Sequence, residues 1–189
     1  MPDCITLPEF VDGVLPSRPL KIVLTGSECT GKSTLASMLA EHYETEYVEE
    51  YLRDYFIAHD GVLTLEDAVP IAEGQLAAEK AVEQRAGDIV LYDTNMLSSV
   101  VYNKHYYNVN PEWIEETFSA REYTLYLLCG IDVPWEADGQ RDRPQEREYM
   151  QGLFRKELEQ RELPFVELTG SAEERFACAV KLIDSLLGN

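Results

Sequence analysis

The chain has 189 residues, of which 45% are hydrophobic; this is enough for one substantial buried core and gives no sign of a second. Its formal net charge is -19 at pH 7, so the phosphate backbone of a nucleic acid would be repelled over most of the surface. These numbers favour one compact domain and argue against a nucleic-acid partner.

Cysteine spacing and the amino terminus bear on the cellular compartment. Cys4, Cys29, Cys129 and Cys178 lie far apart without metal-ligand spacing, which argues against a zinc site and a disulfide framework. The first residues lack a basic region followed by an apolar run, and no later apolar run approaches the roughly 20 residues that span a bilayer. We therefore expect reduced thiols, a cytoplasmic protein and no membrane association.

In chain order, residues 1–19 contain four prolines and are expected to form an irregular arm ahead of a domain at 20–189. Strand-like runs then alternate with helical patterns, which is typical of a parallel sheet covered on both faces. The predicted strands are Leu20–Thr25, Tyr47–Glu49, Ile89–Tyr92, Thr124–Cys129 and Phe165–Leu168. The predicted helices are Lys32–Tyr43, Leu65–Arg85, Asn95–Tyr106, Pro111–Phe118, Gln145–Arg161 and Ala172–Leu187, with Thr64 as an N-cap and Pro111 in a first turn.

The segment GSECTGKS, from Gly26 to Ser33, matches the phosphate-binding pattern G-x-x-x-x-G-K-S/T between a predicted strand and a predicted helix. Such a loop wraps a triphosphate with backbone N–H groups, while Lys32 reaches the β- and γ-phosphates and the Ser33 hydroxyl holds Mg²⁺. The predicted ATP contacts in this loop are Gly26, Glu28, Cys29, Thr30, Gly31, Lys32, Ser33 and Thr34. A chance glycine-rich turn that closes a β-α unit is the weaker alternative.

Asp93 ends the strand-like run IVLYD and is expected to join Ser33 in the Mg²⁺ shell. A regulatory ATPase would usually place Glu after this Asp, but Thr94 follows it here. The patterns that a GTPase needs are also missing. A plain helix N-cap is the competing interpretation of Asp93.

The segment VEEYLRDY follows the second predicted strand, so Glu50 and Arg53 should face the phosphate loop from the same sheet edge. A carboxylate there can orient the acceptor hydroxyl and accept its proton, a role for which Glu50 and Asp93 are both candidates. An exposed charged turn is the alternative interpretation.

Three arginines crowd into the segment that precedes a long helix, at Arg141, Arg143 and Arg147. We expect this segment, about residues 131–147, to be a lid in which Arg141 acts in catalysis while Arg143 and Arg147 bind ATP. Trp135 at its start could stack on a flat base or serve as a packing anchor. A solvated loop with local ion pairs is the alternative.

Together, GSECTGKSTLA, EYLR, DTN and PWEADGQRDRPQER resemble the ribosylnicotinamide kinase domain of the NadR family, from about Leu20 to the end of the chain. The resemblance implies an α/β fold, a P-loop kinase-like three-layer sandwich whose five-stranded parallel sheet has the order 2-3-1-4-5. It implies ATP- and Mg²⁺-dependent phosphorylation of the 5′-hydroxyl of nicotinamide riboside, which yields nicotinamide mononucleotide. The acceptor side would comprise Glu50, Tyr51, Arg53, Asp93, Asn95 and Trp135.

Multidomain NadR relatives also have an adenylyltransferase half and a DNA-binding segment, for which this sequence has no matching motifs, so we expect a stand-alone kinase. Its partner would be a small-molecule nucleoside, and the residues do not indicate an oligomeric state. A kinase for another nucleoside or deoxynucleoside, and a non-catalytic nucleotide sensor, remain alternative functions.

Overall fold

A computed structural model describes residues 17–134 and 146–188 of the chain. Its sheet contains β1 (Leu20–Thr25), β2 (Tyr47–Val48), β3 (Ile89–Asp93), β4 (Leu125–Cys129) and β5 (Phe165–Leu168). All neighbouring strands pair in parallel, in the order β2-β3-β1-β4-β5. The predicted α/β class and strand order are therefore confirmed.

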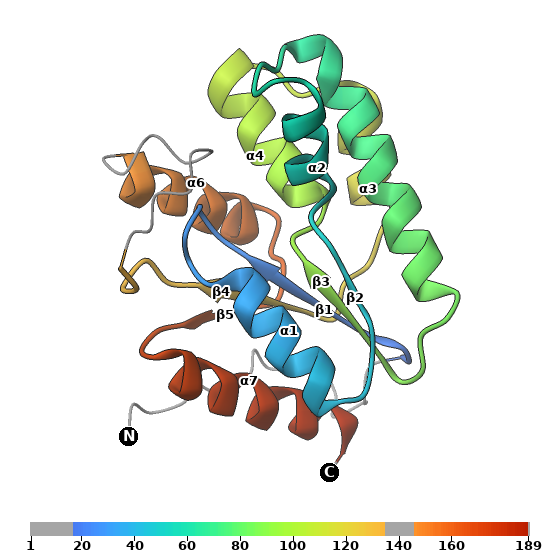
Figure 1. Cartoon of the computed structure of the whole chain (residues 1–189), viewed down its shortest axis with the longest axis vertical. Helices are drawn as coiled ribbons and strands as arrows, with labels where there is room; N and C mark the ends of the chain where they lie inside the picture. The colour runs from blue at the N-terminus through green and yellow to red at the C-terminus, as the bar shows by residue number, and fades with distance from the viewer. Residues whose placement is uncertain (1–16, 135–145, 189) are drawn as a thin grey trace.

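Helices cover both faces of this sheet (Figure 1). They are α1 (Lys32–His42), α2 (Tyr51–Ala58), the short 3-10 helix η2 (Leu65–Asp67), α3 (Ala68–Glu83), α4 (Met96–Tyr107), α5 (Glu112–Ser119), α6 (Arg147–Gln160) and α7 (Ala172–Leu187). One buried cluster joins α1 and α7 to the sheet, and a second joins α3, α4, α5 and α6 to the opposite face. This is the three-layer arrangement that the sequence predicts.

The central strand β1 shows why the sheet is buried on both sides. Leu20, Ile22 and Leu24 pack toward α1 and α7, whereas Val23 belongs to the cluster on the other face. All four side chains have no exposed surface, because successive residues of a strand point to opposite faces. A continuous apolar run therefore suits this strand better than an alternating one.

The main departure from the predicted elements is α2, since the sequence analysis predicted no helix at these residues. The helix has eight residues, none of them fully buried, and it begins without a side-chain cap, so its local signals are weak. The predicted helix Leu65–Arg85 is divided into η2 and α3, and it begins where expected, with the Thr64 N–H and hydroxyl both donating to Asp67. Pro111 lies one position earlier than predicted, as the N-cap of α5.

Two further observations concern the compartment. Cys178 is disulfide-bonded, so the expectation that all four cysteines are reduced is wrong. Across 17–134 and 146–188, no helix combines the length and apolarity needed to cross a membrane.

Candidate active site

The phosphate-binding loop lies between the end of β1 and the start of α1, as its motif requires. Gly26 and Gly31 have φ angles of 127° and 78°, in the region that favours glycine. A Cβ added at Gly26 would lie 2.9 Å from the Cys129 carbonyl oxygen, so a side chain would collide with β4. The first glycine therefore allows the loop to pass close to the neighbouring strand.

Two side chains hold the loop in its curved form. The Lys32 ammonium donates to the Gly26 and Ser27 carbonyl oxygens, at 3.0 and 2.8 Å. Gln151 of α6 accepts from the Ser27 N–H at 2.9 Å and donates to the Cys129 carbonyl oxygen at 3.0 Å. The cation of Lys32 is thus kept within the loop, where a polyphosphate would be bound.

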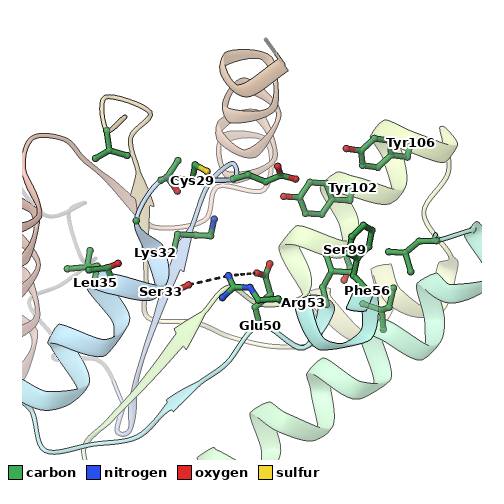
Figure 2. A pocket seen from close by; sticks show the side chains of 18 of the residues that line it. Cys29, Lys32, Ser33, Leu35, Glu50, Arg53, Phe56, Ser99, Tyr102 and Tyr106 are labelled. Carbon is green, nitrogen blue, oxygen red and sulfur yellow. Dashed lines mark hydrogen bonds and ion pairs between the residues drawn. The ribbon is translucent and has the colours of Figure 1, made fainter. Parts of the chain in front are cut away.

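The loop opens onto a cavity of about 770 Å³ that extends to α2 and α4. Its lining includes Lys32, Ser33, Glu50, Arg53, Phe56, Ser99, Tyr102 and Tyr106 (Figure 2). The phosphate-loop residues lie on one side and the tyrosines on the other, with Glu50 and Arg53 between them. A cavity of this size can hold a nucleoside beside a nucleotide's phosphates.

Glu50 and Arg53 face the loop from the start of α2. The Arg53 guanidinium donates to the Glu50 carboxylate at 3.2 Å and to the Ser33 hydroxyl at 3.4 Å. Burial raises the pKa of Glu50 and nearby Asp93 raises it further, while Lys32 and Arg53 oppose the rise. Glu50 is therefore a more basic carboxylate than usual, placed beside the predicted metal ligand Ser33.

Asp93 lies at the carboxyl end of β3, beside Leu24 of β1, and only 3% of it is exposed. Its Oδ1 atom is buried without a hydrogen-bond partner, which is costly for a carboxylate. A hard cation that prefers oxygen ligands would compensate this atom. The residues therefore fit Mg²⁺ held by Asp93 and Ser33.

Three of the described residues that were predicted on the acceptor side do not line the cavity: Tyr51, Asp93 and Asn95. Asn95 is fully buried; its side chain accepts from the Leu97 N–H at 3.1 Å and donates to the Tyr126 hydroxyl at 3.1 Å. The helix cap considered for Asp93 is therefore made by Asn95. Tyr51 instead packs against Gly74 of α3, so neither it nor Asn95 is placed for direct contact with a nucleoside.

Arg147 is the first residue of α6, and its side chain contacts the backbone of the phosphate loop. Its guanidinium donates to the carbonyl oxygens of Cys29, at 2.6 Å, and Val133, at 2.8 Å. Arg147 therefore supports the loop, and its predicted contact with ATP stays a prediction. Trp135, Arg141 and Arg143 lie outside the described residues, so their predicted roles in the lid stay predictions.

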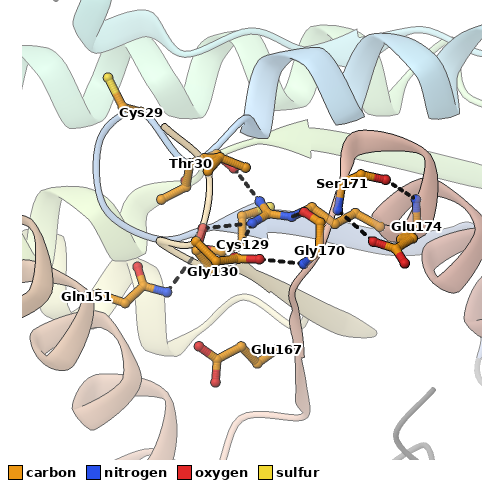
Figure 3. A network of polar contacts seen from close by, with 12 residues as sticks. Cys29, Thr30, Cys129, Gly130, Gln151, Glu167, Gly170, Ser171 and Glu174 are labelled. Atoms are coloured by element: carbon orange, nitrogen blue, oxygen red, sulfur yellow. Dashed lines mark hydrogen bonds and ion pairs between the residues drawn. The ribbon is translucent and has the colours of Figure 1, made fainter. Parts of the chain in front are cut away.

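Arg175 is a site residue that the sequence analysis missed. Only 3% exposed, it donates to the carbonyl oxygens of Thr30 at 2.7 Å, Gly130 at 3.1 Å and Gly170 at 2.9 Å, and pairs with Asp132. Figure 3 shows the three residues that accept from it, Thr30, Gly130 and Gly170, close together. It thereby joins the phosphate loop to the ends of β4 and β5. The sequence did contain a signal for this role: Arg175 lies near the N-terminus of a predicted helix, where the helix dipole disfavours a positive charge, so another contact has to stabilise it there.

The aromatic side of the cavity was also missed. Phe56 comes from α2, while Tyr102 and Tyr106 occupy consecutive turns of α4, with ring centroids 6.1 Å apart and ring planes 20° apart. Their i, i+4 spacing was visible in the sequence. The sequence did not show, however, that the two rings face the phosphate loop, because this depends on how α4 packs (Figure 2).

Comparisons with known proteins agree with this architecture. The chain is 27% identical over 174 residues to the trifunctional NAD biosynthesis/regulator protein NadR of Escherichia coli (strain K12), a match that covers 88% of this chain and 42% of the relative. The chain thus corresponds to less than half of that protein's length.

Solved structures of NadR proteins are similar as well. One in complex with NR has a TM-score of 0.73 and 23% identity, covering 90% of this chain and 50% of the other. One in complex with NAD and AMP-PNP has a TM-score of 0.72 and 24% identity, with the same coverage. The resemblance to NadR is therefore confirmed in sequence and in fold.

A family model described as an AAA domain matches residues 21–175, which include the phosphate loop, Glu50, Asp93 and Arg175. Since this match spans most of the sequence, the chain belongs to the AAA domain family.

Proposed function

We propose that this protein transfers the γ-phosphoryl group of ATP to the 5′-hydroxyl of nicotinamide riboside, forming nicotinamide mononucleotide. The observation that carries the proposal is one cavity in which Lys32 and Ser33 of the phosphate loop face Glu50 and Arg53 of α2. Phosphoryl transfer depends mostly on positioning and charge stabilisation, and this cavity offers both.

Each side chain has a distinct role in the proposed reaction. Lys32 would stabilise charge on the phosphates, and bound Mg²⁺, held by Ser33 and Asp93, would neutralise charge that develops during transfer. Glu50 would orient the acceptor hydroxyl in line with the γ-phosphate and accept its proton. Arg53 keeps the Glu50 carboxylate close to Ser33. Asp93 is buried beside Glu50, so its charge also helps to set the basicity of that group.

The distribution of charge along the cavity supports a nucleoside with a cationic base. Among the described lining residues, the basic side chains are Lys32, Arg53 and Arg175, and all three contact the phosphate loop. The far side offers the rings of Phe56 and Tyr102. The pyridinium ring of nicotinamide riboside carries a positive charge, which aromatic faces attract.

We further propose that residues 20–189 act as the kinase domain and that the segment 131–147 closes over ATP. In that arrangement Arg141 stabilises the transferring phosphate, Arg143 binds ATP and Trp135 contacts the base. Water is then excluded from the reaction, which limits hydrolysis of ATP.

A substrate panel tests the proposed function. Purified protein with ATP and Mg²⁺ should phosphorylate nicotinamide riboside with a higher kcat/KM than thymidine, adenosine or the reduced, uncharged dihydronicotinamide riboside. Since the reduced nucleoside has nearly the same size, cation–π attraction of about 0.5–2 kcal/mol predicts a preference of roughly 2- to 30-fold for the charged form.

The panel also separates the alternatives. Turnover of thymidine or adenosine with none of nicotinamide riboside would replace the proposed substrate with another nucleoside. Nucleotide binding that requires Lys32, with no phosphorylation of any nucleoside, would instead point to a sensor.

A further inference from the structure

Helix α2 carries the proposed base but is weakly anchored by its own side chains. Glu50 immediately precedes this helix and Arg53 lies in its first turn, yet none of its residues is fully buried. A catalytic carboxylate has to be held within about 0.5 Å of its working position. Some contact outside the helix must therefore hold its first turn in place.

The Tyr51 ring lies against a glycine of α3. A Cβ added at Gly74 would lie 2.1 to 2.5 Å from three atoms of that ring, closer than side chains approach one another. Gly74 lies in the interior of a helix, where glycine is less favourable than alanine by about 0.5–1 kcal/mol. Its φ angle is not positive, so the close approach of Tyr51 is the reason for glycine here.

The next residue of α3 holds the backbone of Tyr51. Gln75 is 4% exposed, and its side-chain oxygen accepts the Tyr51 N–H at 3.0 Å. This N–H belongs to the first turn of α2, where no partner is available within the helix. Glu50 is bonded covalently to that nitrogen, so this hydrogen bond constrains the backbone of the proposed base.

A buried ionic group lies one helical turn from Gln75. Glu79 lies one turn further along α3, has no exposed surface, and accepts from Arg121 at 2.9 Å and the Tyr123 hydroxyl at 2.9 Å. Burial raises the pKa of Glu79, while Arg121, Tyr123 and the nearby Gln75 amide oppose the rise. Gln75 Nε2 and Glu79 Oε1 are both buried without a hydrogen-bond partner, so Glu79 acts on Gln75 through its charge, which favours the orientation in which the Gln75 oxygen faces Tyr51.

From these contacts we infer that Gly74 and Gln75 are positioning residues for phosphoryl transfer. They hold the first turn of α2 by its ring and by its N–H, and so set the distance from Glu50 and Arg53 to the phosphate loop. This inference rests on the proposed function for the role of Glu50, whereas the anchoring of α2 can be tested without it.

The ring contact is tested by a double-mutant cycle. Gly74→Ala should lower kcat by about 100-fold with little change in the KM for ATP, because the acceptor carboxylate moves while the phosphate loop does not. In a Tyr51→Ala background, the same change should alter kcat by less than about twofold, since the ring it would strike is gone.

Gly152→Ala is the matched control, because Gly152 also lies in a helix and an added Cβ there meets nothing within 4 Å. It should leave kcat unchanged. Equal losses from Gly74→Ala with and without the Tyr51 ring, or no loss in either background, would overturn the positioning role.

The backbone contact is tested without any activity. In Gln75→Met, the Tyr51 amide should exchange with deuterated solvent about fivefold faster, because one hydrogen bond is lost while the shape is kept. Gln84→Met at the exposed end of the same helix should leave this rate unchanged.

These two readouts separate failure of the inference from failure of the proposed function. If no nucleoside is phosphorylated while Gln75→Met speeds exchange at Tyr51, the anchoring is supported and the kinase assignment fails. An unchanged exchange rate would refute the anchoring itself.

Discussion

At the residue scale, the charges around Glu50 determine the pH at which it can accept a proton. Burial and Asp93 raise its pKa, and Lys32 and Arg53 lower it. Because the raised pKa keeps the carboxyl protonated to a higher pH, kcat/KM should rise as pH increases through that pKa. A protonated Glu50 cannot act as the base.

Removing one of the cations that lower the pKa of Glu50 should shift the pH profile in a known direction. Arg53→Met takes away a cation beside Glu50, so the midpoint of the acidic limb of kcat/KM against pH should move to higher pH. Arg85→Met, which removes a cation from the exposed pair with Glu46, is the control and should leave the midpoint in place. A shift to lower pH in Arg53→Met would mean that Glu50 is not the group observed.

Individual residues differed in how far the sequence defined their roles. The positions of Gly26, Lys32 and Ser33 follow from a contiguous motif, and the structure places them in one loop. Asn95 was adjacent to the site in sequence, yet its side chain is turned into the core to cap α4. Proximity along the chain did not determine which way that side chain points.

At the element scale, helix ends are defined by local hydrogen bonds. Ser171 caps α7: its hydroxyl accepts the Glu174 N–H at 3.2 Å, while the Glu174 carboxylate accepts the Ser171 N–H at 2.9 Å. Such a capping box can be read from sequence, and the predicted range of α7 is confirmed.

Loss of this cap has a measurable cost. Ser171→Ala should lower the free energy of unfolding by about 1 kcal/mol, since a helix N–H loses its acceptor. Urea denaturation measures the change. Ser185→Ala, at an exposed position of the same helix, should have no such cost. Equal destabilisation by both variants would show that the cap is not responsible.

Helix α2 shows the limit of local patterns. It is eight residues long, buries none of them fully and begins without a side-chain cap, so the local signals of a helix are weak. The helix is defined largely by contacts with α3, such as those at Gly74 and Gln75. Without those contacts in view, the sequence analysis predicted no helix there.

At the scale of the whole molecule, Arg175 connects parts of the chain that are distant in sequence. It holds the Thr30 carbonyl in the phosphate loop, Gly130 after β4 and Gly170 after β5. One buried guanidinium therefore ties the catalytic loop to two other strand ends.

Removing the guanidinium group of Arg175 should weaken both the fold and nucleotide binding. Arg175→Met leaves three carbonyl oxygens without this donor, so the free energy of unfolding should fall by about 3 kcal/mol and ATP should bind more weakly. Urea denaturation and an ATP titration measure these effects. Arg155→Met removes a partly exposed pair with Glu167 and should cost at most about 1 kcal/mol. Similar losses in the two variants would contradict the connecting role.

The sequence by itself determined the α/β class, most of the strands and helices, and the phosphate loop. Each depends on local information: strand runs, helical periodicity, caps, and a motif whose residues are consecutive. The tertiary structure alone decided that Tyr51 packs against Gly74, that Arg175 supports the loop, and that Tyr102 lies across the cavity. These relations join elements far apart in the chain, and they arise from packing on the two faces of the sheet, which no local pattern specifies.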